Sequence, residues 1–114
     1  GTNKNFTCIR YAEILLMYAE ALTQGATNST MTVLNAVNRV RTRAALPALT
    51  SVDNTAVMNE KYAELAMEWG TRYYDLVRLG KYSELSYDGR TFTDSKIFLP
   101  YPQTQVDLLP ALKK

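Results

Sequence analysis

The chain has 114 residues, of which 46% are hydrophobic and 21% charged, and its formal net charge is +2. A length near about 100–150 residues is typical of one domain with its own core, and this hydrophobic content excludes an intrinsically disordered chain. So small a charge excess does not indicate a nucleic-acid partner. We therefore expect a single folded domain over residues 1–114 that binds no nucleic acid.

Two residue types that carry much of enzyme chemistry are scarce. Cys8 is the single cysteine, and histidine is absent. An intramolecular disulfide, the Ser-His-Asp and Cys-His triads and the common zinc-ligand sets are therefore excluded. Histidine is also the commonest general base near neutral pH, so we expect no enzyme, no catalytic residue, no metal and no cofactor. The longest apolar run, Ile14–Ala19, is far short of the about 20 residues that cross a bilayer.

The first two predicted helices form a hairpin. Apolar residues recur at helical spacing over about residues 9–24 and again over about residues 31–45. Gly25 breaks the chain between them, the oxygen-bearing side chains at 28–30 are candidate caps, and Pro47 ends the second helix. Such a hairpin is the unit of tetratricopeptide-like arrays and leaves an apolar face without cover. We therefore expect self-association through an exposed apolar face.

Two more helices and an irregular tail are predicted after the hairpin. Asp53 is a good N-cap for a third helix over about residues 54–69, and a short fourth helix is expected over about residues 72–79. The tail beyond is polar and rich in turn residues, with at most a short strand at Ile97–Leu99 and one helical turn over 104–108. The predicted fold class is mainly α.

Three glutamates lie four residues apart and so share one face of the third helix. Carboxylates placed in this way could act as an acid–base pair, and a small hydrolase using Glu64 and Glu68 is one hypothesis. They also repel one another, so the favoured interpretation is pairing with basic residues, the nearest being Lys61 beside the stripe and Arg72 and Arg78 just beyond it. The residues expected to form this structural charge network are Glu60, Glu64, Glu68, Arg72, Asp75 and Arg78.

A basic group on the second helix, Arg39, Arg41 and Arg43, together with Arg10, raises the question of an anionic partner. Residues 39 and 43 share a helix face, whereas residue 41 points roughly the opposite way, so the three cannot line one groove. A solvated face with one interhelical salt bridge is the expectation.

Tyrosine is unusually common, with eight copies, and its flat apolar ring with a polar tip suits stacking on sugars. Five tyrosines fall in predicted helices, where core packing is expected: Tyr11, Tyr18, Tyr62, Tyr73 and Tyr74. Three aromatic residues around the Asp88–Gly89 turn are candidate glycan-binding residues: Tyr82, Tyr87 and Phe92. Anchoring of the loop by the same three side chains is the favoured alternative.

Four blocks, in this order along the chain, resemble segments of the SusD/RagB family. They are RYAEILLMYAEAL at 10–22, LNAVNRVRTRA at 34–44, EKYAELAME with RYYDLVRLG between 60 and 80, and LPYPQTQVDLLP at 99–110. The chain departs from the family's pattern at Ala45, where a helix-ending glycine is common, at Trp69, which stands between Glu68 and Gly70, and at Lys61, Gln105 and Leu109.

The resemblance implies a surface-exposed outer-membrane lipoprotein that captures glycan or another nutrient for a TonB-dependent transporter of the SusC type. Family members are several hundred residues long, so the chain resembles their C-terminal part, and Cys8 does not match their lipid-bearing cysteine. No motif carries a ligand-binding residue onto this chain. An independent helical protein-interaction module of the tetratricopeptide type is the alternative.

Overall fold

The computed structural model of the chain describes residues 3, 5, 7–27 and 30–112. It is mainly helical, which confirms the predicted fold class. The structure divides into two compact units, Gly1–Asp75 and Leu76–Lys114, and each has its own architecture.

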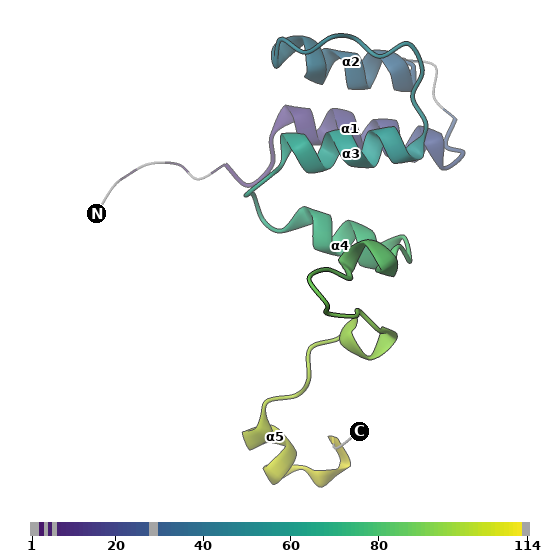
Figure 1. Cartoon of the computed structure of the whole chain (residues 1–114). Coiled ribbons are helices and arrows are strands. Elements are labelled where there is room, and N and C mark those ends of the chain that lie inside the picture. The colour runs from purple at the N-terminus through teal and green to yellow at the C-terminus, as the bar shows by residue number, and fades with distance from the viewer. Residues whose placement is uncertain (1–2, 4, 6, 28–29, 113–114) are drawn as a thin grey trace. The chain divides into compact units, whose positions relative to one another are not determined.

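Three helices lie side by side in the first unit, namely α1 (Tyr11–Thr23), α2 (Val33–Arg43) and α3 (Asn54–Glu64) (Figure 1). The chain reverses between α1 and α2, as the predicted hairpin requires. The loop after α2 then returns along the helix, because the Asn38 side chain accepts from the amide of Leu49 and donates to its carbonyl, at 2.8 and 3.0 Å. As a result α3 also packs against α1.

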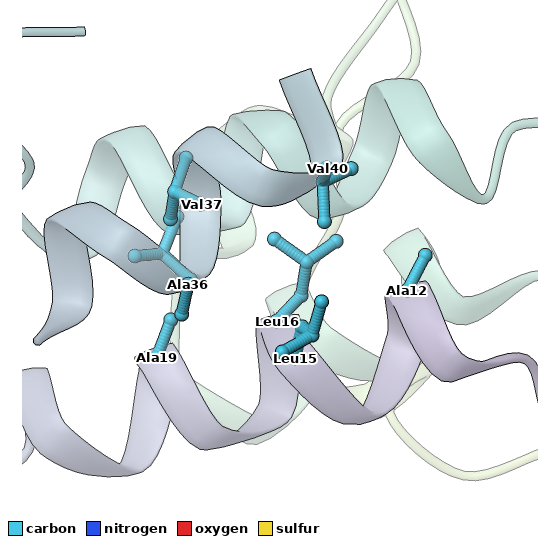
Figure 2. Packing of buried hydrophobic residues seen from close by; sticks show 8 residues of the cluster. Ala12, Leu15, Leu16, Ala19, Ala36, Val37 and Val40 are labelled. Carbon is cyan, nitrogen blue, oxygen red and sulfur yellow. The ribbon is translucent and has the colours of Figure 1, made fainter. Parts of the chain in front are cut away.

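The core of the first unit lies mainly between α1 and α2. Leu16 and Ala19 of α1 and Ala36 and Val37 of α2 have no exposed surface, and Figure 2 shows Ala19 beside Ala36. Two alanines at one contact let the helices approach closely, and burial of a side chain such as Leu16 contributes roughly 1.5–3 kcal/mol. Val57 of α3 completes the cluster, so α3 covers part of the hairpin's apolar face.

The helix starts follow capping chemistry. The Asp53 side chain accepts from the amide of Ala56 at 2.7 Å, so Asp53 is the N-cap of α3, in agreement with the sequence. The N-cap of α2 is Thr32, whose hydroxyl accepts from the amide of Asn35 at 3.1 Å. The predicted cap at residues 28–30 is therefore wrong for Thr30, while residues 28–29 lie outside the described ranges.

The third helix is shorter than predicted. It ends at Glu64, whereas the apolar spacing predicted a helix up to residue 69. Met67, Trp69 and Gly70 have φ values of 65°, 45° and 65°, which no α-helix tolerates. The chain then enters α4 (Thr71–Arg78), which begins in the first unit and continues into the second.

The second unit contains short helical turns. After the end of α4 come η1 (Tyr82–Leu85), η2 (Asp94–Lys96), α5 (Gln103–Leu108) and η3 (Pro110–Leu112). At most a short strand was expected at Ile97–Leu99, and none forms, because residues 97–99 join no ladder and the prolines that follow cannot donate to one.

Three helices end in the same way, on a residue with positive φ: Gly25 after α1, Ala45 after α2 and Gly80 after α4. At the end of α2 the Leu46 amide donates to the Arg41 carbonyl at 2.9 Å, and the Ala45 amide donates to the Thr42 carbonyl at 3.1 Å. These two bonds form a Schellman motif, in which glycine is favoured at the left-handed position. Ala45 has a φ of 56°, so its Cβ is strained there.

Replacing Ala45 by glycine should therefore stabilise the protein. We expect Ala45→Gly to raise the free energy of unfolding by about 1 kcal/mol, since it relieves the left-handed strain. Ala44→Gly is the matched control, because Ala44 keeps a φ of −83° and the change should cost about 0.5–1 kcal/mol. Urea unfolding followed by circular dichroism measures both, and equal effects of the two changes would contradict the motif.

Candidate functional site

The carboxylate face of α3 meets arginines of α2. Glu60 pairs with Arg41 at 2.6 Å, and Glu64 pairs with Arg43 at 2.5 Å. Two interhelical salt bridges thus replace the single one expected. Arg41 reaches Glu60 although it points away from residues 39 and 43, because its long side chain bends around the helix end and its Nε donates to the Pro47 carbonyl at 2.8 Å. Arg39 lies over the ring of Tyr11 instead.

Arg10, the N-cap residue of α1, binds Glu64 at the end of α3 and Glu68 in the turn that follows. Its Nε and Nη2 donate to the two oxygens of Glu68 at 3.0 and 2.8 Å, and its Nη1 donates to Glu64 at 2.7 Å. The hydrogen bonds from Glu68, then those from Glu64, raise the pKa of Arg10 above its usual range. The guanidinium therefore keeps its charge, and titration of Arg10 itself would remove this contribution to stability only above the pKa of an unfolded arginine.

Lys61 lies at the centre of a second, buried charge cluster. Its Nζ is 3.0 Å from Asp75, in the middle of α4, and 3.5 Å from Glu20 of α1. The three side chains are each less than a tenth exposed. One lysine thus pairs with two buried carboxylates and connects α1, α3 and α4.

Of the cations predicted to pair with these carboxylates, Lys61 binds Asp75, whereas the three glutamates are bound by Arg10, Arg41 and Arg43. The pairing predicted for Arg72 with a carboxylate stays a prediction. Arg72 donates to the carbonyl of Met58 at 3.5 Å, and its guanidinium lies 4.9 Å from the ring centre of Tyr62. Arg78 falls in the last turn of α4, within the second unit, and its pairing stays a prediction.

These contacts favour a structural role for Glu64 and Glu68 over the hydrolase hypothesis. Both carboxylates are bound by Arg10, Glu64 at 2.7 Å and Glu68 at 2.8 Å, so both take part in ion pairs that join neighbouring segments of the fold. Among the described residues, no group of three or more acidic, cysteine or histidine side chains is placed to hold a metal ion.

Two of the three candidate glycan-binding residues contact each other. The rings of Tyr82 and Phe92 lie 5.6 Å apart, and the Phe92 amide donates to the Ser86 hydroxyl at 3.0 Å. Both side chains are partly buried, as expected of residues that anchor a loop. Tyr87 lies beside the Asp88–Gly89 turn, where it bridges to Arg90, and its side chain is open to solvent.

The core packing predicted for the helical tyrosines is wrong for most of them. Tyr18 is partly buried, and its hydroxyl donates to the Met31 carbonyl at 2.9 Å. The other four are exposed, because α1, α2 and α3 already fill the core with alanine, leucine and valine: Tyr11, Tyr62, Tyr73 and Tyr74. Trp69 is exposed as well, and its departure from the family's pattern is the one sequence signal that singles it out.

The fold and its charge clusters define a helical scaffold in which one helix binds its two neighbours through ion pairs. The chain belongs to the SusD family, whose sequence model matches residues 1–94. This confirms the resemblance found in the sequence. In the described ranges no helix is long and apolar enough to cross a membrane.

Among solved structures, the chain is similar to the surface glycan-binding protein A from Bacteroides thetaiotaomicron, in complex with laminarihexaose. The sequence identity is 34% and the TM-score is 0.78. The match covers 98% of this chain and 25% of that protein, so the chain spans about a quarter of its relative's length. The comparison with curated proteins finds no match.

The buried cluster predicts a large effect of removing its lysine. Lys61→Met should lower the free energy of unfolding by about 3–5 kcal/mol, because Glu20 and Asp75 would stay buried without the charge of Lys61. Arg39→Met, which removes a charge from an exposed residue, should cost less than about 1 kcal/mol.

Chemical denaturation of both variants measures the difference. Adding Asp75→Asn to Lys61→Met should recover part of the loss, since one buried charge is then removed. Similar small losses for Lys61→Met and Arg39→Met would mean that the cluster is solvated.

Proposed function

We propose that the chain is the scaffold part of a SusD-like protein that captures glycan or another nutrient at the cell surface. The observation that carries this proposal is the match to the SusD family over most of the chain, supported by likeness to a surface glycan-binding protein. The ion pairs between α3 and its neighbours suit a part that keeps its shape while ligand is held elsewhere. Binding, and not catalysis, is the activity proposed.

We further propose that the protein is a surface-exposed outer-membrane lipoprotein and passes its ligand to a TonB-dependent transporter of the SusC type. Both proposals come from the family to which the chain belongs. The alternative of an independent interaction module is less well supported, since a plain helical hairpin array has no need of the Glu60–Gly80 block or of the proline-rich segment near residue 100.

The transporter proposal can be tested in the cells that make the protein. Antibodies raised against the chain should label intact cells, and from detergent-solubilised outer membranes they should co-precipitate a TonB-dependent transporter. An antibody to an abundant cytoplasmic protein is the control for lysis. Recovery of the protein in the cytoplasmic fraction, or from the outer membrane without a transporter, would contradict the proposal.

Self-association of the isolated chain is a further expectation. Ile14 and Met17 lie three residues apart on the outer face of α1, and close to half of each side chain is exposed. We expect a concentration-dependent dimer in sedimentation velocity, because pairing of these faces removes apolar surface from water. Met17→Glu should abolish it, whereas Gln24→Glu adds the same charge at the end of the helix and should not. A chain that stays monomeric at every concentration tested would refute this expectation.

A further inference from the structure

Four exposed aromatic residues lie in the stretch of chain where α3 passes into α4. Tyr62, Trp69, Tyr73 and Tyr74, which we call the aromatic corner, all belong to the first unit, and their exposed fractions are 54%, 59%, 37% and 67%. The rings of Tyr73 and Tyr74 meet edge to face at 5.5 Å. The guanidinium of Arg72 lies over the Tyr62 ring, so α4 contacts α3 at Tyr62.

The backbone at this corner is strained in a way that packing does not explain. Trp69 and Met67 both have positive φ, a conformation that costs a residue with a side chain on the order of 1–3 kcal/mol. Met67 is fully exposed, and more than half of Trp69 is in water. Trp69 is also the residue that departs from the family's pattern between Glu68 and Gly70. Strain and exposure of a large aromatic ring together indicate a role in binding.

Ion pairs hold the corner on both sides. Glu68, which precedes Trp69, is held by two hydrogen bonds from Arg10, and Asp75, which follows Tyr74, is held by buried Lys61. Between them the Tyr73 amide donates to the Gly70 carbonyl at 3.1 Å. Aromatic rings on a backbone fixed at both ends lose little entropy when a ligand stacks on them.

We propose that the aromatic corner is a carbohydrate-stacking site, with Trp69 and Tyr74 as the platform for pyranose rings. The apolar C–H face of a sugar fits a flat indole or phenol ring, while the tyrosine hydroxyls and the Arg72 guanidinium supply hydrogen bonds to sugar hydroxyls. This proposal rests on the proposed function, since glycan capture is what makes a saccharide the expected occupant. It adds to that function a contact site within the scaffold itself.

Trp69 is the single tryptophan of the chain, so its fluorescence reports on the proposed site directly. Titration of the whole chain with laminarihexaose should shift the tryptophan emission, with a dissociation constant on the order of 1 mM, as expected of a small exposed platform. Maltohexaose and cellohexaose, titrated in the same way, test for a preference among linkages. Tyr74→Ala should weaken the response by about fivefold or more, whereas Tyr74→Phe keeps the ring and should retain it.

Tyr101→Ala is the matched control, because Tyr101 has a similar exposed fraction, 52%, but lies in the second unit. Circular dichroism of each variant shows whether it is folded. Emission that stays unchanged with all three hexasaccharides up to about 10 mM would overturn the proposal. A response that Tyr87→Ala abolishes and Tyr74→Ala does not would also overturn it. So would an emission change that depends on the protein concentration and not on the added sugar.

Failure here can be told apart from failure of the proposed function. Co-precipitation of a transporter together with unchanged Trp69 emission would leave the family role standing and remove the aromatic corner as a site.

Discussion

The contact between the carboxylate face of α3 and the basic residues of α1 and α2 is the interaction on which the first unit depends. Glutamates four residues apart on one helix repel each other, so α3 on its own is destabilised by its own sequence. Once the three helices are packed, this repulsion is outweighed by attraction between the glutamates and three arginines, Arg10, Arg41 and Arg43. Charge pairing therefore makes the apolar core and the carboxylate face of α3 mutually dependent.

The same charges determine which surfaces are available for binding. Glu60 and Glu64 are held in ion pairs with arginine, Glu60 through one oxygen and Glu64 through both. Glu68 and Asp75, by contrast, frame a short segment whose side chains are largely in solvent. A buried ion pair adds little net stability, but it fixes geometry. If one partner moves away, the other is left as a charge out of contact with water, which is unfavourable. The ion pairs of Glu68 with Arg10 and of Asp75 with Lys61 thus hold the backbone on either side of Trp69 to Tyr74.

Much of the fold could be read from local sequence signals. The hairpin of α1 and α2, the Asp53 cap and the short α4 follow from apolar spacing and from capping chemistry, which act within a few residues. The apolar spacing predicted too long a third helix, because Leu65 and Trp69 continue the apolar pattern although the backbone has already left the helix. The apolar run at Ile97–Leu99 forms no strand, because a strand needs a partner strand and the nearby segments provide none.

The sequence by itself determined the family, the mainly helical class and the set of carboxylates that had to be neutralised. Only the tertiary structure decided which cations neutralise them: Arg10 and Lys61 bind residues 54 and 14 positions away, respectively, and helix periodicity carries no information about such pairs. It also decided which aromatic rings are exposed. Tyr62, Tyr73 and Tyr74 look like core residues along the helices, but the space between α1, α2 and α3 is already filled by small and branched side chains.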